Sequence, residues 1–203
     1  MDMEGLSAIC ADLGMVEEDE RDNRFSYFKG EYCLDLIPII EHCQDDRNLV
    51  SNAVKVLVFL TMPVEPSSND IPQQIEHLWG LKSSITCSDT VPVIVLLLEG
   101  INLYSEAFTE DDWKLVQLVL TLFRNVLAVQ DIPRQQQAGG SASQFITLSD
   151  GFLELLFNEN VMDIILVITL RVGDPEFVAS AHLKGSKVDY FMSLFICLAN
   201  GEG

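Results

Sequence analysis

The chain has 203 residues, a length that suits one domain or at most two. Hydrophobic residues make up 48% of it and charged residues 21%, a balance that excludes an intrinsically disordered protein. The formal charge of −19 opposes nucleic-acid binding by the chain alone, because such binding depends on clustered cations.

The five cysteines indicate a reducing compartment, because they are odd in number and include no C-x-x-C pair. The N-terminus has no basic segment before an apolar stretch, so we do not expect a cleaved secretory signal. No stretch reaches the roughly 18 uncharged apolar residues of a membrane span. We therefore expect a soluble, intracellular protein without a membrane partner. The acidic run from Glu17 to Glu20 is typical of a solvated linker, and an acidic docking segment is the alternative.

From Asp45 onward the sequence predicts one helix after another, each beginning at a capping residue and ending near Gly or Pro. The first predicted helix begins at Asp45-Asp46 and ends at Pro63. The second begins at Asp70 and has Pro72 in its first turn, and the third begins at Thr90 with Pro92 and ends at Gly100. In the second of these we expect Ile75, Leu78 and Trp79 to point inward.

The clearest predicted helix covers about residues 111–130, after a capping-box pattern at Thr109 and Asp112. Most of its residues are apolar, and the exceptions are spaced three or four apart: Lys114, Gln117, Thr121, Arg124 and Asn125. Such a pattern predicts a helix that is buried on nearly every side except one polar stripe.

Beyond this helix the polar, Gln- and Gly-rich residues 131–143 predict a mobile loop. Three more helices are then expected, capped by Ser149, by Asn160 and by Pro175, the last one ending near Gly185. The β-branched runs Val91–Val95 and Ile164–Thr169 leave buried parallel strands as the alternative, but the capping residues and the lengths favour helices.

These features predict an all-α fold in which pairs of helices stack as an armadillo- or HEAT-like solenoid. A repeat of about 40 residues is typical of that class. The prolines expected to begin helices, at positions 38, 72, 92, 133 and 175, support this period only weakly.

Residues that could carry chemistry have simpler structural interpretations. Cys33, His42, Cys43, His77 and Cys87 are zinc ligands or Cys/His nucleophile pairs by type, but they lack the close spacing of metal sites and any local catalytic motif. The pairs Asp45-Asp46 and Asp111-Asp112 could act as general acid and base, yet each lies where a helix begins and predicts a cap. Gly139-Gly140-Ser141 lacks the lysine of a phosphate loop. We therefore expect no enzyme, no catalytic residue, no metal, no cofactor and no small-molecule substrate.

Five stretches of the sequence resemble the N-terminal domain of the Timeless family, and their residues are similar to the plant type of that family. They are DLIPII from Asp35, NAVKVLVFLTMPVE from Asn52, DIPQQIEHLW from Asp70, LFRNVLAV from Leu122 and FNENVMDIIL from Phe157. The resemblance implies an armadillo-like solenoid in the nucleus that acts without catalysis in the replication fork protection complex. It implies a Tipin-like partner, contact with the replicative helicase and other replisome proteins, and roles in fork pausing and stability, checkpoint signalling and DNA repair. DNA would be contacted only indirectly or in the full assembly.

The chain also departs from the family pattern. Residues 1–189 resemble the domain, with apparent internal deletions at 34/35 and 173/174, whereas residues 190–203 form a divergent apolar tail. These departures predict an incomplete solenoid from a shortened or alternatively spliced product. The alternative function is therefore a generic helical-repeat adaptor, or a truncated isoform without fork activity. The sequence does not indicate which residues bind a partner.

Overall fold

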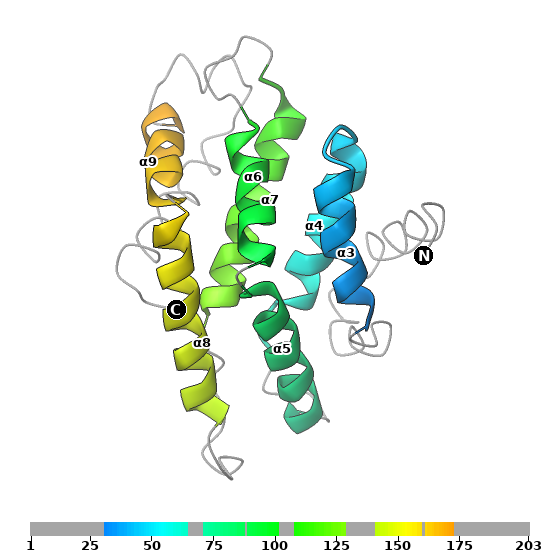
Figure 1. Cartoon of the computed structure of the whole chain (residues 1–203), viewed down its shortest axis with the longest axis vertical. Coiled ribbons are helices and arrows are strands. Elements are labelled where there is room, and N and C mark those ends of the chain that lie inside the picture. The colour runs from blue at the N-terminus through cyan, green and yellow to red at the C-terminus, as the bar shows by residue number, and fades with distance from the viewer. Residues whose placement is uncertain are drawn as a thin grey trace.

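The computed structural model describes residues 31–64, 71–87, 89–101, 108–128, 141–159 and 161–172. Within these ranges every regular element is a helix, which confirms the all-α class (Figure 1). The helices are α3 (Glu31–His42), α4 (Arg47–Leu60), α5 (Ile71–Ile85), α6 (Thr90–Glu99), α7 (Glu110–Leu127), α8 (Ser141–Asn158) and α9 (Val161–Val172). The strand alternative is wrong for both runs, because Val91–Val95 lies in α6 and Ile164–Thr169 lies in α9.

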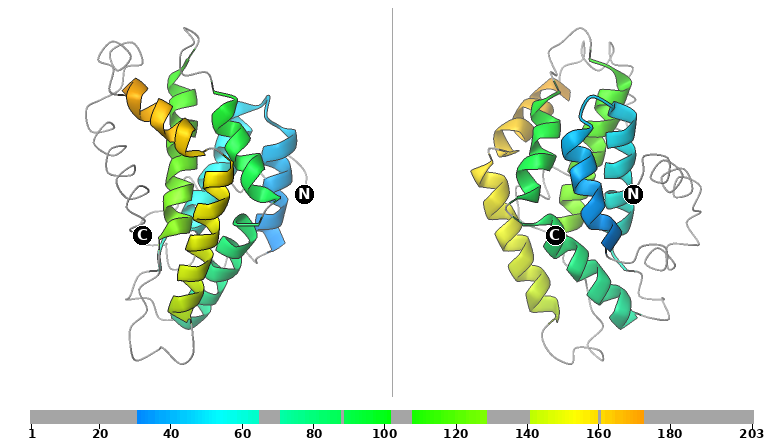
Figure 2. Two further views of the ribbon diagram at one scale, coloured as in Figure 1. Left: turned by 60° about the vertical axis from the view of Figure 1, so that its left-hand side comes forward. Right: turned by 45° about the vertical axis from the view of Figure 1, so that its right-hand side comes forward.

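The helices pack in two layers of three. In one layer α7 lies between α4 and α8, and in the other α6 lies between α3 and α9. Across the layers α3 packs on α4 and α6 on α7, and α8 and α9 form a third pair that meets end to end, with α9 beyond the end of α8 (Figure 1). The first and last pairs lie on opposite sides of the middle pair (Figures 1 and 2). The helix α5 connects the first pair to the middle one and packs against α6 and α8.

The predicted caps at the start of α4 and α7 are confirmed. The Asp46 carboxylate accepts a hydrogen bond from the Leu49 backbone N–H at 3.1 Å. At α7 the Thr109 hydroxyl accepts from the Asp112 N–H at 3.2 Å, and the Asp112 carboxylate accepts from the Thr109 N–H at 3.0 Å. This reciprocal pair satisfies two N–H groups that the first turn of a helix leaves without intrahelical acceptors.

Two of the prolines expected to begin helices do so. Pro72 and Pro92 lie in the first turns of α5 and α6, where a missing N–H is tolerated. The expectation is wrong for Pro38, which lies inside α3. The helix α3 also runs without a break through the predicted deletion point at 34/35. Pro133 and Pro175 lie outside the described residues, as does the helix expected to begin at Pro175.

The boundary predicted between the loop and α8 is wrong. The helix begins at Ser141, so residues 141–143 are helical, whereas residues 131–140 lie outside the described part of the chain. Ser149 is not a cap either, because it lies in the middle of α8. Its buried hydroxyl donates to the Leu127 carbonyl at the end of α7, at 2.7 Å. A tertiary hydrogen bond thus uses the hydroxyl that the sequence suggested for a cap.

The main hydrophobic core is centred on α4 and α7, which share the most extensive contact in the structure. The rings of Phe123 on α7 and Phe152 on α8 meet edge to face, with centroids 5.6 Å apart. The predicted polar stripe of α7 is confirmed except at Asn125, which is buried. The Asn125 side-chain amide donates to the Val58 carbonyl on α4 at 3.0 Å, so it joins the two central helices instead of facing water.

Among the described helices, none is by itself both long and apolar enough to span a membrane. Parts of α5 and α6 reach the length and apolar composition of a membrane span only when the two are taken together, and they are bent by 67° relative to each other.

Candidate functional site

The acidic residues considered for catalysis stabilise helix ends. Asp46 and Asp112 are the caps described above, and Asp112 also lies 3.8 Å from Arg47. Asp111 accepts a hydrogen bond from the exposed Lys114 ammonium at 2.9 Å. This hydrogen bond, followed by the negative charges of Asp111 and Glu110, raises the pKa of Lys114 above its ordinary value of 10.5. These contacts lie at the starts of α4 and α7, and none of the carboxylates is among the residues that line the described cavity.

The residues considered as zinc ligands come from two regions of the fold. Cys33 and His42 lie in α3, and Cys43 is the residue after this helix. His77 lies in α5, and Cys87 follows the end of α5. The Cys87 sulfur lies 2.9 Å from the Thr90 hydroxyl at the start of α6. Among the described residues, no three His, Cys, Asp or Glu side chains lie close enough together to hold a metal ion.

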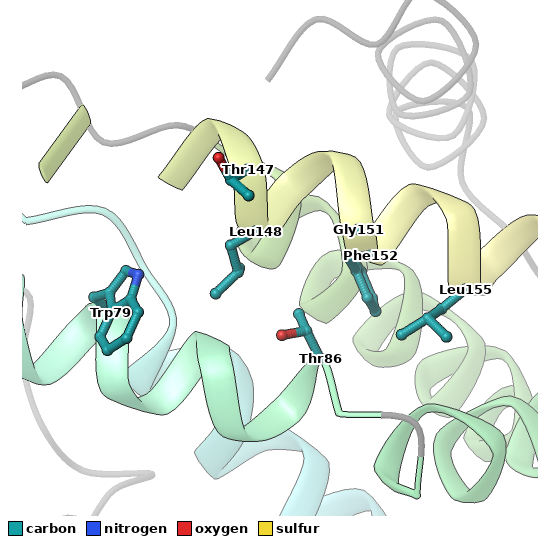
Figure 3. Close-up of a pocket in the computed structure, with 7 residues that line it drawn as sticks. All are labelled: Trp79, Thr86, Thr147, Leu148, Gly151, Phe152 and Leu155. Atoms are coloured by element: carbon teal, nitrogen blue, oxygen red, sulfur yellow. The ribbon is translucent and has the colours of Figure 1, made fainter. Parts of the chain in front are cut away.

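An apolar groove lies between α5 and α8, with a cavity volume of about 430 Å³ (Figure 3). Its lining comes from Trp79 of α5, from Thr86 just after that helix, and from one side of α8: Thr147, Leu148, Gly151, Phe152 and Leu155. The two helices are far apart in the sequence, and Figure 3 shows their side chains projecting into the same space.

The groove exists because buried polar groups attach α5 and α8 to the same end of α7. Lys82 of α5 is only 1% exposed, and its ammonium donates to the Ala128 carbonyl at 2.7 Å. The same ammonium lies 5.3 Å from the centre of the Phe145 ring of α8. A cation is favourable at this position because the last carbonyls of a helix lack intrahelical donors and carry partial negative charge. Lys82 therefore fixes the spacing of α5, α7 and α8.

The chemistry of the groove suits apolar binding and not catalysis. None of its lining side chains titrates near neutral pH, and the polar groups among them are the hydroxyls of Thr86 and Thr147 and the indole N–H of Trp79. The Thr86 hydroxyl is engaged as a donor to the Ser83 carbonyl at 3.2 Å. A ligand in this groove would be held mainly by contact with Leu148, Leu155 and the Trp79 ring, because Phe152 is buried in the core beneath it.

Sequence reasoning missed the groove, and at Trp79 it was wrong. The Trp79 side chain is 37% exposed, because its ring faces the groove and not the core, in contrast to the fully buried Leu78 beside it. One signal in the sequence could have indicated the site. Gly151 interrupts an apolar helical pattern, and a Cβ atom at this position would meet nothing within 4 Å.

A second apolar surface lies on the outer sides of α8 and α9. On α8, Phe157 is 60% exposed, and on α9 Leu170 is 65% exposed. Leu166 and Val167 of α9 are also exposed, whereas Ile165 and Ile168 are buried. The helix α9 is therefore apolar on both sides but covered on one.

Comparison with models of protein families gives a match to the Timeless protein over residues 18–183. The chain belongs to the Timeless family. The match covers most of the 203 residues and includes every described helix. No curated protein and no solved structure matches the chain. The predicted deletions at 34/35 and 173/174 and the divergent tail at 190–203 stay predictions.

Proposed function

We propose that this chain is a non-catalytic scaffold of the replication fork protection complex. In this role it supports the pausing and stability of replication forks, DNA replication checkpoint signalling and DNA repair. The observation that carries the proposal is the match to the Timeless family over residues 18–183. The apolar groove between α5 and α8 supports a binding role, because its lining offers apolar contact area and no side chain that titrates near neutral pH.

We also propose that the fold is an incomplete armadillo-like solenoid. Support comes from the three helix pairs, which stack so that each layer adds one helix per pair. In a solenoid each repeat covers the apolar face of its neighbour. Leu166, Val167 and Leu170 of α9 are exposed close to the predicted deletion at 173/174, where a further helix of the family pattern would pack.

The proposed partners are a Tipin-like protein and components of the replicative helicase, in the nucleus. The formal charge of −19 supports indirect contact with DNA, through partners or within the full assembly, because direct binding to a phosphate backbone needs clustered cations. The competing proposal is a helical-repeat adaptor or truncated isoform without fork activity. The uncovered side of α9 favours it, because a solenoid that ends on an apolar face lacks part of its partner surface or its cap.

A pull-down from nuclear extract tests these two proposals. The tagged chain is compared with the tag alone and with a Phe123→Asp variant, whose core is disrupted. We expect a Tipin-like protein and helicase subunits to return with the chain and with neither control. Return of neither component, from a chain whose circular dichroism shows that it is folded, would contradict the fork-protection function.

A further inference from the structure

The floor of the groove between α5 and α8 has the shape and surface of a helix-binding site. Leu148, Phe152 and Leu155 project from one helix, and the exposed Trp79 ring faces them from the other. Apolar grooves between two helices recognise the apolar stripe of a third helix, whose anchoring side chains recur every three or four residues. Phe152 is buried at the base of the groove, so the apolar surface open to a partner is that of Trp79, which is 37% exposed, and of the half-buried Leu148 and Leu155. Apolar surface that stays open to solvent in this way can mark an interaction site.

Gly151 widens the groove in a way that the packing of the chain does not require. Glycine in the interior of a helix costs about 0.5–1 kcal/mol relative to alanine. No atom lies within 4 Å of the Cβ that alanine would add here, so the described fold has room for a side chain. The missing side chain leaves space at the floor for an approaching backbone or side chain of another molecule.

The edges of the groove are acidic on both helices. Glu76 lies one helical turn before Trp79 on α5, and Asp150 and Glu154 each lie one helical turn after a lining residue of α8, Thr147 and Gly151. All three carboxylates are exposed, and helical spacing places them along the outer edges of the groove. The one Lys or Arg on these two helices is Lys82, whose ammonium is buried against Ala128. Apart from the His77 imidazole next to Glu76, the acidic edges therefore have no basic side chain beside them on α5 or α8.

We propose that this groove is the docking site for an amphipathic helix of a partner protein that carries Lys or Arg on both flanks of its apolar stripe. The apolar stripe fills the space between Trp79 on α5 and the accessible Leu148 and Leu155 on α8, and the flanking cations lie against Glu76, Asp150 and Glu154. Charge complementarity of this kind favours basic partners over acidic ones and speeds their association. The inference rests on the proposed scaffold function, for which it names a binding surface and the chemistry of the partner.

The chain contains its own reporter for this binding. Of its two tryptophans, Trp113 is fully buried, whereas Trp79 lines the groove and is 37% exposed. A helix that docks in the groove removes Trp79 from water and shifts its fluorescence to shorter wavelength. A Trp79→Phe variant assigns the signal, because only Trp113 remains in it.

The probe is a synthetic amphipathic peptide of about 18 residues, long enough to form a helix. It has Leu at helical spacing and Lys on both flanks, and a matched peptide carries Glu in place of Lys. We expect the Lys peptide to shift the Trp79 emission with an affinity at least roughly tenfold higher than the Glu peptide, and we expect added salt to reduce this difference.

Two variants separate the groove from the overall negative charge of the chain. Asp150→Lys with Glu154→Lys reverses charges at the groove, whereas Asp45→Lys with Glu99→Lys makes the same net change at exposed positions in the α3–α4 turn and at the end of α6. We expect the first pair to weaken binding of the Lys peptide roughly tenfold and the second pair to change it by less than about twofold.

Gly151→Leu fills the floor of the groove without changing its charge, and Gly80→Leu is the matched control on α5, where a Cβ also meets nothing within 4 Å. We expect loss of peptide binding in the first variant only, with both variants folded by circular dichroism.

Equal binding of both peptides, or full binding to Gly151→Leu, would overturn the proposal. A shift of Trp79 emission with protein concentration alone would also overturn it, because a second copy of the chain would then be the occupant. If the titrations fail while the pull-down succeeds, the groove is wrong and the scaffold function stands.

Discussion

The helices α7 and α9 are both rich in apolar residues, yet only α7 is enclosed. In α7 the apolar side chains from Trp113 to Val126 are buried on several sides, and the polar Asn125 is buried with them. In α9, Ile165 and Ile168 are buried, whereas Leu166 and Leu170 on the other side are exposed. The difference follows from position: α7 lies between α4 and α8 and packs on α6, whereas α9 lies at the end of its layer. Neighbouring helices and not composition decide which apolar side chains are buried.

The largest contrast is expected between two phenylalanines. Phe123 is buried on α7 against Phe152, and Phe157 is 60% exposed on α8. Phe123→Ala leaves a cavity in the enclosed core and should lower the free energy of unfolding by about 3–5 kcal/mol. Phe157→Ala removes the same atoms from a largely solvated site and should lower it by less than about 0.5 kcal/mol. Urea denaturation followed by circular dichroism measures both, and similar losses would contradict the assignment of core and edge.

The attachment of α5 and α8 to α7 gives the second largest effect. Lys82→Met removes the ammonium that donates to the Ala128 carbonyl, so this carbonyl loses a partner inside the structure. We expect a loss of about 1–3 kcal/mol in the free energy of unfolding. Lys55→Met is the control, because Lys55 is exposed on α4, and it should leave the urea midpoint nearly unchanged. A Lys82→Met variant as stable as the Lys55→Met variant would show that the buried ammonium is not needed to hold the three helices together.

A substitution in the groove between α5 and α8 should stabilise the fold. Gly151→Ala adds a Cβ atom that meets nothing within 4 Å and improves the helix propensity of α8. The free energy of unfolding should therefore rise by about 0.5–1 kcal/mol. Thermal melts of Gly151→Ala and wild type measure the sign of the change. A lower melting temperature in the variant would mean that the groove is narrower than the structure shows.

The smallest effect concerns the ion pairs at the start of α7. Because the pKa of Lys114 is raised in the folded chain, its contribution to stability is complete below 10.5 and is lost as the pH rises through the raised pKa. Lys114 is exposed, so the loss should be barely measurable. Urea midpoints of wild type and Lys114→Met, compared from neutral pH to above 10.5, should converge only at the alkaline end. A large gap at neutral pH would show that this exposed cluster contributes more than its solvation allows.

Local features of the fold could be predicted from the sequence, because the signals for them are local. The caps at Asp46 and Thr109, and the helices of the β-branched runs in α6 and α9, follow from residues within a few positions of one another. Tertiary roles could not be predicted. The sequence pattern predicts a surface position for Asn125 and a helix cap for Ser149. Each side chain instead donates a hydrogen bond to a carbonyl on another helix.

The groove could not be predicted for the same reason. Trp79 and Leu148 are far apart in the sequence and meet because Lys82 and Ser149 attach their helices to the end of α7. No local sequence pattern indicates that α5 and α8 lie next to each other. Gly151 departs from the expected helical pattern, but Gly80 does the same in α5, and an interior glycine does not say what approaches it.

Hydrogen exchange of the native chain, resolved by peptide mass spectrometry, tests the distinction between enclosed core and open edge most directly. The account predicts that amides in the middle of α7, enclosed by α4, α6 and α8, exchange only through global unfolding. It predicts that amides of α9, uncovered on the side of Leu166 and Leu170, exchange faster by a factor of roughly ten or more. Equal protection of α7 and α9 would contradict the account, because it would mean that the outer side of α9 is covered as fully as the core.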